Sequence, residues 1–194
     1  MTSYVFRDGA IDYKRLEEMV KVIGKGALVL DLSCRKKDCD GGYFVVTDRW
    51  QKFTDFEITE ENLIMLSKYC DEYLVHGVDV EGLRVGVMED LVEKLGMWSP
   101  IPVTYAGGAR SISDLELVKR LGRGNVDLTV GSALDIFGGD LPYDTVVKWH
   151  YANFDVLEDA DKVVRMRVIA ARAAVAAKNT LDEANRAFRL SLEM

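Results

Sequence analysis

Short apolar runs recur along the chain and alternate with stretches of helical periodicity. The runs are rich in β-branched and aromatic residues and cover residues 27–32, 73–78, 102–106 and 126–130. Each run is almost continuous in hydrophobicity, which is typical of strands that are buried on both faces of a parallel sheet. The pattern therefore predicts four parallel strands in one sheet.

Amphipathic stretches accompany these runs and predict helices over residues 12–23, 59–70, 88–95 and 113–121. Thr59 and Ser113 are residue types that cap helix N-termini. Gly24 and Gly122 stand where helix C-caps are expected. Strands that alternate with helices indicate right-handed βαβ units, so the expected fold class is α/β with a parallel sheet.

Two segments depart from this alternation. Residues 33–57 form a long connection in which an alternating apolar stretch at 43–46 predicts a hairpin. Long loops in compact domains usually carry function, so we favour a role in a site over a plain surface excursion. From about residue 159 the chain is rich in Ala and Arg, which favour helix. A tail without fixed structure is the alternative.

Composition and charge limit the kinds of partner that the chain is expected to bind. The chain is 48% hydrophobic and 29% charged, which is ordinary for a globular protein. Its net charge of -7 gives no general attraction for nucleic acid. No apolar run approaches the roughly 20 residues that span a bilayer. We read Cys34, Cys39 and Cys70 as reduced thiols of an intracellular protein, in a spacing that predicts no metal site.

Two turns of small residues follow the last two apolar runs. They are Gly107-Gly108 and Gly131-Ser132-Ala133, and each precedes a stretch that we expect to be helical. Ligands of parallel α/β proteins bind at the C-terminal ends of the strands. Small-residue turns leave backbone N–H groups free for an anion, and a helix N-terminus adds favourable charge. We therefore predict phosphate binding here, in preference to turns that only reverse the chain.

Three side chains are candidates for chemistry. Asp31 lies in an apolar run, where a carboxylate needs a partner or a polar cavity, and we favour a site over an ion pair with Arg35 or Lys36. His76 ends another run and is equally compatible with a packed core residue or with a proton carrier. Trp50, in the long connection, either stacks on a substrate ring or holds the loop.

Other polar residues near the strand ends carry weaker signals. Asp79 and Glu81 follow the second run and either hold the loop or serve the site. Cys34 lies close to Asp31, but no histidine neighbours it in sequence, so we expect a small packed thiol rather than a nucleophile.

Several of these segments together closely resemble the eukaryotic phosphoribosylformimino-5-aminoimidazole carboxamide ribotide (ProFAR) isomerases of histidine biosynthesis. The matching segments keep their order and spacing over roughly residues 2–150, and they are 28–37, 48–51, 79–82, 105–110 and 126–139. The resemblance implies a (β/α)8 TIM barrel and an Amadori rearrangement that converts an aminoaldose to an aminoketose. It also implies a substrate with a phosphate at each end, no cofactor and no metal.

The resemblance assigns roles to individual residues. Two carboxylates act as general acid and base in this family, one on the first strand and one on the fifth, and Asp31 matches the fifth-strand aspartate. Trp50 matches a loop tryptophan that stacks on the substrate. His76 is assigned to substrate binding, although bacterial relatives usually carry threonine there. The second phosphate site is matched by Gly107, Gly108, Gly131 and Ser132.

The resemblance also implies that the chain carries only part of the barrel. It begins near the end of the fourth family strand, so we expect residues 1–152 to form the phosphate-binding C-terminal half of a TIM barrel, with about four βα units. Residues 153–194 are the Ala/Arg-rich helical tail. Four strands cannot close such a barrel. A missing N-terminal half, a second copy of the chain or the tail would have to cover the open side.

The expected function is that of a ProFAR isomerase that needs its N-terminal half, in the cytoplasm or, alternatively, in a plastid. A non-catalytic sugar-phosphate-binding or assembly half-barrel is the second hypothesis, and the sister cyclase of the pathway fits residues 31–35 less well. The first two hypotheses differ in whether a second carboxylate reaches the site. Its candidates within this chain are Asp79, Glu81 and Asp135.

Overall fold

A computed structural model describes residues 2–38 and 41–153. The expected tail beyond Asn153 and the thiol of Cys39 lie outside the described residues. Contacts divide the chain into two units, Met1–Trp149 and His150–Met194, and the fold described below is that of the first. No helix in the described ranges has the length and apolarity that crossing a membrane requires.

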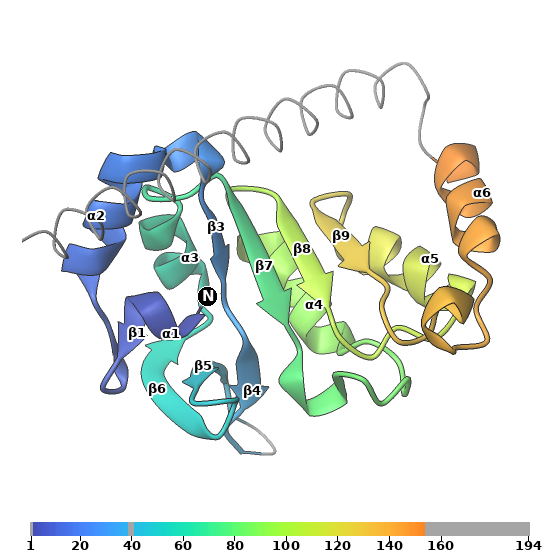
Figure 1. Ribbon diagram of the computed structural model, residues 1–194, viewed down its shortest axis with the longest axis horizontal. Coiled ribbons are helices and arrows are strands. Elements are labelled where there is room, and N and C mark those ends of the chain that lie inside the picture. The colour runs from blue at the N-terminus through green and yellow to red at the C-terminus, as the bar shows by residue number, and fades with distance from the viewer. Residues whose placement is uncertain (1, 39–40, 154–194) are drawn as a thin grey trace, which may run out of the picture. The chain divides into compact units, whose positions relative to one another are not determined.

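The centre of this unit is a four-stranded parallel sheet with the order β3-β7-β8-β9 (Figure 1). Its strands are β3 (Val29–Asp31), β7 (Glu72–His76), β8 (Val103–Ala106) and β9 (Val126–Thr129). The helices that alternate with them are α3 (Glu60–Leu66), α4 (Glu89–Trp98) and α5 (Ile112–Leu121). All four expected strands and their parallel pairing are therefore confirmed.

Further elements precede and follow the sheet. The chain starts with α1 (Thr2–Val5), β1 (Phe6–Arg7), β2 (Ala10–Ile11), α2 (Tyr13–Ile23) and η1 (Lys25–Ala27). After β7 and β9 come two short 3-10 helices, η2 (Val78–Val80) and η3 (Asp135–Phe137). The last described element is α6 (Tyr143–Asn153).

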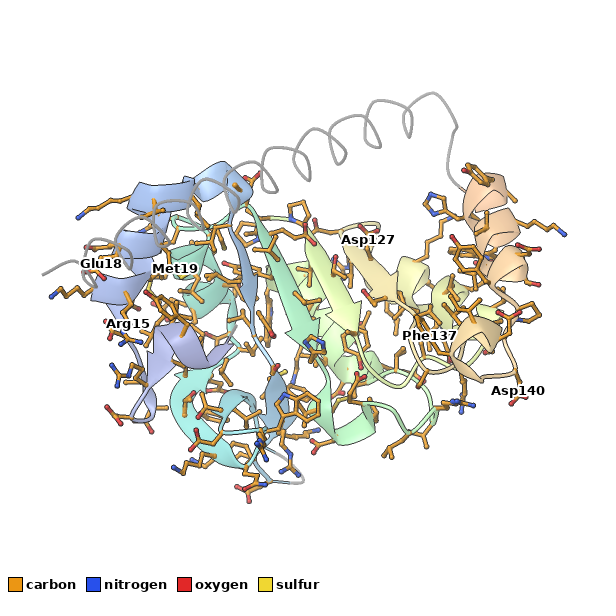
Figure 2. The ribbon with its side chains drawn as sticks, viewed as in Figure 1. Arg15, Glu18, Met19, Asp127, Phe137 and Asp140 are labelled. Atoms are coloured by element: carbon orange, nitrogen blue, oxygen red, sulfur yellow. The ribbon has the colours of Figure 1, made fainter. Side chains whose placement is uncertain are left out.

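The sheet buries one face, and the expectation of burial on both faces is wrong. On the helix side the core contains Leu30, Tyr73, Val75 and Tyr105, packed with leucines of α3 and α4. The opposite face carries a row of aligned residues from the four strands: Asp31, Leu74, Thr104 and Asp127. On that face Val29 is 45% exposed and Asp127 is exposed (Figure 2). Within the described ranges this face stays open, as expected for half of a barrel.

The long connection after β3 forms a second, antiparallel sheet. Its strands are β4 (Cys34–Lys36), β5 (Tyr43–Thr47) and β6 (Lys52–Glu57). The expected hairpin is thus confirmed, with one additional strand. At its tip Asp48, Arg49 and Trp50 all have left-handed backbones, with φ of 51°, 57° and 69°. Three such residues in succession store backbone strain. Residues other than glycine adopt the left-handed conformation only where the surrounding structure imposes it.

Helix boundaries follow the capping residues. Thr59 caps α3 as expected, because its hydroxyl accepts a hydrogen bond from the N–H of Asn62. Helix α5 begins one residue earlier than expected, at Ile112, and of the two serines that the sequence offers as its cap, Ser111 and Ser113, the cap is Ser111. The reason is a capping box between Ser111 and Asp114, which satisfies two N–H groups at the start of the helix.

Candidate active site

Asp31 and His76 meet at the C-terminal ends of two adjacent parallel strands. Because β3 pairs in register with β7, these ends lie side by side. The Asp31 Oδ1 atom accepts a hydrogen bond from the Ser33 hydroxyl at 3.0 Å and lies 3.3 Å from His76 Nδ1. The two side chains are 27% and 25% exposed, so a ligand on the open face could reach both. His76 therefore belongs to a polar cluster and is not a packed core residue.

The two groups shift each other's pKa in the direction that favours an ion pair. Burial raises the pKa of Asp31, but the hydrogen bonds from His76 and Ser33 and the charge on His76 outweigh it and hold the pKa below its ordinary 3.8. The hydrogen bond to Asp31 raises the pKa of His76 above its ordinary 6.5, against the effect of burial, and the charges of Asp31 and Glu81 add to the rise. The cluster thus holds an ionised carboxylate beside an imidazole with increased proton affinity.

The competing ion pairs of Asp31 do not form. Arg35 Nε binds Asp79 Oδ1 at 2.6 Å, and Lys36 Nζ binds Asp90 Oδ2 at 3.2 Å. Both cations are therefore engaged with other carboxylates. The hypothesis that Asp31 pairs with Arg35 or Lys36 is wrong.

Two of the three candidates for a second carboxylate are occupied elsewhere. Asp79 holds Arg35 and also accepts the N–H of Lys36 at 3.4 Å. Asp135 accepts the N–H groups of Ile136 and Tyr143 at 2.8 and 3.0 Å, and so organises the turn before α6. Their carboxylates serve loop structure.

Glu81 is the candidate carboxylate that lies nearest to the glycine turn. Its Oε2 atom lies 3.4 Å from the position that a Cβ on Gly107 would take, and its charge raises the pKa of His76. It therefore faces the turn after β8. Sequence reasoning named Glu81 only as an alternative. The signal that could have singled it out is its place beside Gly82, which has φ of +71° and turns the loop back.

The glycines of the turn after β8 are explained by close approach of neighbouring loops. Gly107 and Gly108 have φ of 125° and 75°. A Cβ on Gly107 would lie 2.7 Å from the carbonyl oxygen of Gly77, and one on Gly108 would overlap the carbonyl oxygen of Gly86. The backbone N–H groups of Gly107 and Gly108 donate to no acceptor in the described part of the chain. The turn therefore has a packing role and leaves two donors for a ligand.

The turn after β9 is more open. A Cβ on Gly131 would meet nothing within 4 Å. Among the described residues the N–H groups of Gly131 and Ser132 have no acceptor either. The expected helix directly after this turn is absent from the described chain, since only the three-residue η3 follows before α6.

The start of α5 carries its own negative charge. The Asp114 carboxylate accepts the N–H groups of Arg110 and Ser111 at 2.9 and 3.2 Å. This carboxylate opposes a second anion at the helix N-terminus that sequence reasoning offered to a phosphate. The N–H groups of the preceding turn are the more favourable place for an anion at this edge.

Two other predicted residues make no hydrogen bond with Asp31 or His76 in the described part of the chain. Trp50 sits at the strained hairpin tip with a side chain that is 41% exposed, and it makes no hydrogen bond or ring contact with any described residue. Cys34 is fully buried, and burial raises the pKa of its thiol far above the ordinary value. The expectation of a packed, unreactive thiol is confirmed. In the described ranges no cluster of three or more His, Cys, Asp or Glu side chains could hold a metal ion.

Comparison with known proteins agrees with the resemblance seen in the sequence. The family described as "Histidine biosynthesis protein" matches residues 9–141. A Medicago truncatula protein named 1-(5-phosphoribosyl)-5-((5-phosphoribosylamino)methylideneamino) imidazole-4-carboxamide isomerase, chloroplastic, is 57% identical over 150 residues, which are 77% of this chain and 47% of the relative. Isomerases of the same name from Yarrowia lipolytica and Saccharomyces cerevisiae are 49% and 44% identical over 77% of this chain.

The chain spans about half to three-fifths of the length of these relatives, with 47%, 60% and 59% covered. The matched residues 9–141 contain the whole parallel sheet, the Asp31–His76 contact and Glu81. The fold, the order of its elements and these matches together make the chain a member of the histidine biosynthesis protein family.

Proposed function

We propose that the chain is the C-terminal half of a ProFAR isomerase and acts in histidine biosynthesis once an N-terminal half completes its barrel. The observation that carries the proposal is the contact of Asp31 with His76 at the strand ends of the open face, beside the glycine turn that Glu81 faces. The identities of 44% to 57% to isomerases support the same reaction class.

The Amadori rearrangement needs an acid and a base. The acid protonates the ring oxygen of the aminoaldose as its bond to the anomeric carbon breaks, which leaves an iminium ion. The base then removes a proton from the adjacent carbon, and the resulting enol becomes the aminoketose. Two phosphate sites hold the substrate in a reactive pose.

The environments of the titratable groups suggest their roles. Asp31, with its lowered pKa, is the group suited to accept the carbon-bound proton. His76, with its raised pKa, is suited to deliver the proton to the ring oxygen, and the nearby charge of Glu81 favours its protonated form. In this proposal the turns at Gly107-Gly108 and Gly131-Ser132 bind one phosphate through their N–H groups, and Trp50 stacks on the substrate.

The charge on the open face helps to decide whether an N-terminal half or a second copy of the chain completes the barrel. It carries Asp31, Glu72 and Asp127, of which Glu72 accepts a hydrogen bond from Thr104 at 2.6 Å. A second copy would present the same carboxylates, and like charges at close range oppose association. The acidic face therefore favours a separate N-terminal half over self-association.

The deciding experiment is turnover of ProFAR by the purified chain, alone and with a separately produced N-terminal half. Asp31→Asn should lower turnover by about a thousandfold or more, as loss of a general base does. Asp127→Asn is the matched control, because Asp127 lies in the same row of the open face but outside the cluster. Normal turnover by Asp31→Asn would show that the assigned role is wrong.

A non-catalytic sugar-phosphate-binding module is the second candidate. The match covers only 47% of the Medicago relative, and one face of the sheet is open. Both facts favour this candidate, because an unfinished barrel can keep a phosphate site without turnover. Saturable binding of ProFAR without conversion, even with the N-terminal half present, would support this candidate and contradict the first.

A further inference from the structure

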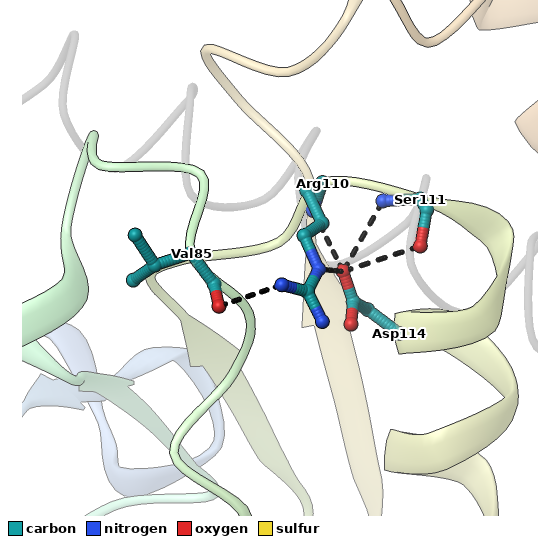
Figure 3. Close-up of polar contacts among 4 residues, drawn as sticks. All are labelled: Val85, Arg110, Ser111 and Asp114. Carbon is teal, nitrogen blue, oxygen red and sulfur yellow. Dashed lines mark hydrogen bonds and ion pairs between the residues drawn. The ribbon is translucent and has the colours of Figure 1, made fainter.

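Arg110 connects two loops at the C-terminal edge of the sheet (Figure 3). It lies two residues after Gly108, and its Nη1 atom donates a hydrogen bond to the carbonyl oxygen of Val85 at 2.9 Å. Its Nε atom lies 3.5 Å from Asp114 Oδ2, and the Asp114 side chain is only 4% exposed. One guanidinium thus joins the loop after β7 to the start of α5.

The loop that Arg110 contacts covers the glycine turn. The N–H of Gly86 donates to the carbonyl oxygen of Gly108 at 2.9 Å. The guanidinium of Arg110 lies 3.2 Å from the position of a Cβ on Gly86, so it packs against the backbone of that residue. Gly82, Arg84 and Gly86 have φ of 71°, 53° and 106°. A stretch with three left-handed residues is costly to order and needs contacts that hold it.

The same loop carries Glu81. At its beginning Asp79 is tied to Arg35 at 2.6 Å, and near its end Val85 is tied to Arg110 at 2.9 Å. Glu81 therefore lies between two anchored points in the sequence and faces Gly107. The first anchor, Arg35, is in strand β4, whereas the second, Arg110, follows the Gly107-Gly108 turn that we propose as part of the phosphate site.

We propose that Arg110 is a positioning residue that holds residues 82–86 against the Gly107-Gly108 turn and so sets Glu81 in the site. The proposal rests on the proposed function for its catalytic consequence, but not for the loop contact itself. Arg110 does not touch the reacting atoms in this account. Its guanidinium suits the task because its planar fork reaches a carbonyl oxygen and a buried carboxylate at once.

The test compares Arg110→Ala, Arg110→Lys and the control Arg120→Ala, which removes an exposed arginine from the other end of α5. The capping box survives in Arg110→Ala because Asp114 binds backbone N–H groups. Amide hydrogen exchange should become about tenfold faster at Gly86 in Arg110→Ala, the effect of losing one charge-assisted hydrogen bond. The increase should be smaller in Arg110→Lys and absent in Arg120→Ala.

Two results would overturn the proposal. One is an unchanged exchange rate at Gly86 in Arg110→Ala, or an equal rise in Arg120→Ala. The other is wild-type affinity for ProFAR, measured by calorimetry, in an Arg110→Ala protein whose loop exchanges faster. A wild-type chain that binds no ProFAR even with the N-terminal half present would contradict the proposed function instead, and the exchange rates alone would then decide the role of Arg110.

Discussion

At the scale of single residues, the Asp31–His76 contact makes a prediction about proton affinity. The pKa of His76, followed by NMR of its ring, should lie above 6.5 in the wild type and fall in Asp31→Asn, because the carboxylate that stabilises the imidazolium is lost. Asp127→Asn should leave it unchanged, since Asp127 is aligned with Asp31 but makes no contact with His76. A His76 pKa that does not respond to Asp31→Asn would contradict the contact.

The same pair makes stability depend on pH. The pKa of His76 is raised on folding, so its contribution to the free energy of unfolding is complete below about pH 6.5 and is lost as pH rises through the raised value. The pKa of Asp31 is lowered, so its contribution is present above about pH 3.8 and is lost as pH falls through the lowered value. Urea unfolding of the wild type and of His76→Gln should therefore differ most between these limits, by about 1 kcal/mol.

The role of a residue could be predicted from the sequence where it depends on the residue's position in a strand. It could not be predicted where it depends on the conformation of a loop. Asp31 was identifiable because a carboxylate in an apolar run is costly to bury without a polar partner, and His76 is that partner. Glu81 was not, because a loop of left-handed residues determines which of several nearby carboxylates turns inward. Ser111 and Ser113 are both good caps, and the side chain of Asp114 selects between them.

At the scale of elements, Gly108 tests the close approach of the loop after β7. Gly108→Ala should reduce the free energy of unfolding by about 3 kcal/mol, because the new methyl group would meet the carbonyl oxygen of Gly86 and the backbone would be strained. Gly124→Ala is a matched control with the same φ of 75° and nothing within 4 Å, and should cost about 1 kcal/mol. Equal losses in urea unfolding would mean that only backbone strain matters.

Gly131 offers a cleaner test of the phosphate site than Gly108, because its substitution disturbs no packing. A Cβ at Gly131 would meet nothing within 4 Å, so Gly131→Val should keep the wild-type urea midpoint. By crowding the free N–H groups it should weaken binding of inorganic phosphate about tenfold, equivalent to about 1.4 kcal/mol. Gly26→Val, equally open but located before β3, should bind like the wild type, and the same affinity in both variants would remove the site from this turn.

Elements were predictable to the extent that hydrophobic periodicity specified them. The parallel strands and three of the helices that alternate with them follow from local patterns, whereas their boundaries depend on caps and on tertiary contacts. The continuous apolar runs predicted burial on both faces, yet Val29 and Asp127 show that one face is open here. A continuous apolar run is therefore compatible with a strand that buries only one of its faces.

At the scale of the whole molecule, the open face should be the surface that an N-terminal half covers. Val29 lies on the edge strand β3, on this face, and is 45% exposed. Val29→Asp should leave the free energy of unfolding of the isolated chain, measured in urea, within about 0.5 kcal/mol of the wild type, since exposed positions tolerate substitution. It should strongly weaken the complex with the N-terminal part of the Yarrowia relative, because a new carboxylate would be buried without a partner.

Val22→Asp is the matched control for this prediction, because Val22 is 68% exposed on α2, away from the sheet. Sedimentation of each variant with the N-terminal part would give the affinity, and ProFAR turnover of the mixture would show whether the completed sheet restores the site. If Val29→Asp associates and turns over as well as Val22→Asp, the open face is not the assembly surface. Asp31 and His76 would then have to work beside an exposed sheet, where water screens the charges that shift their pKa values.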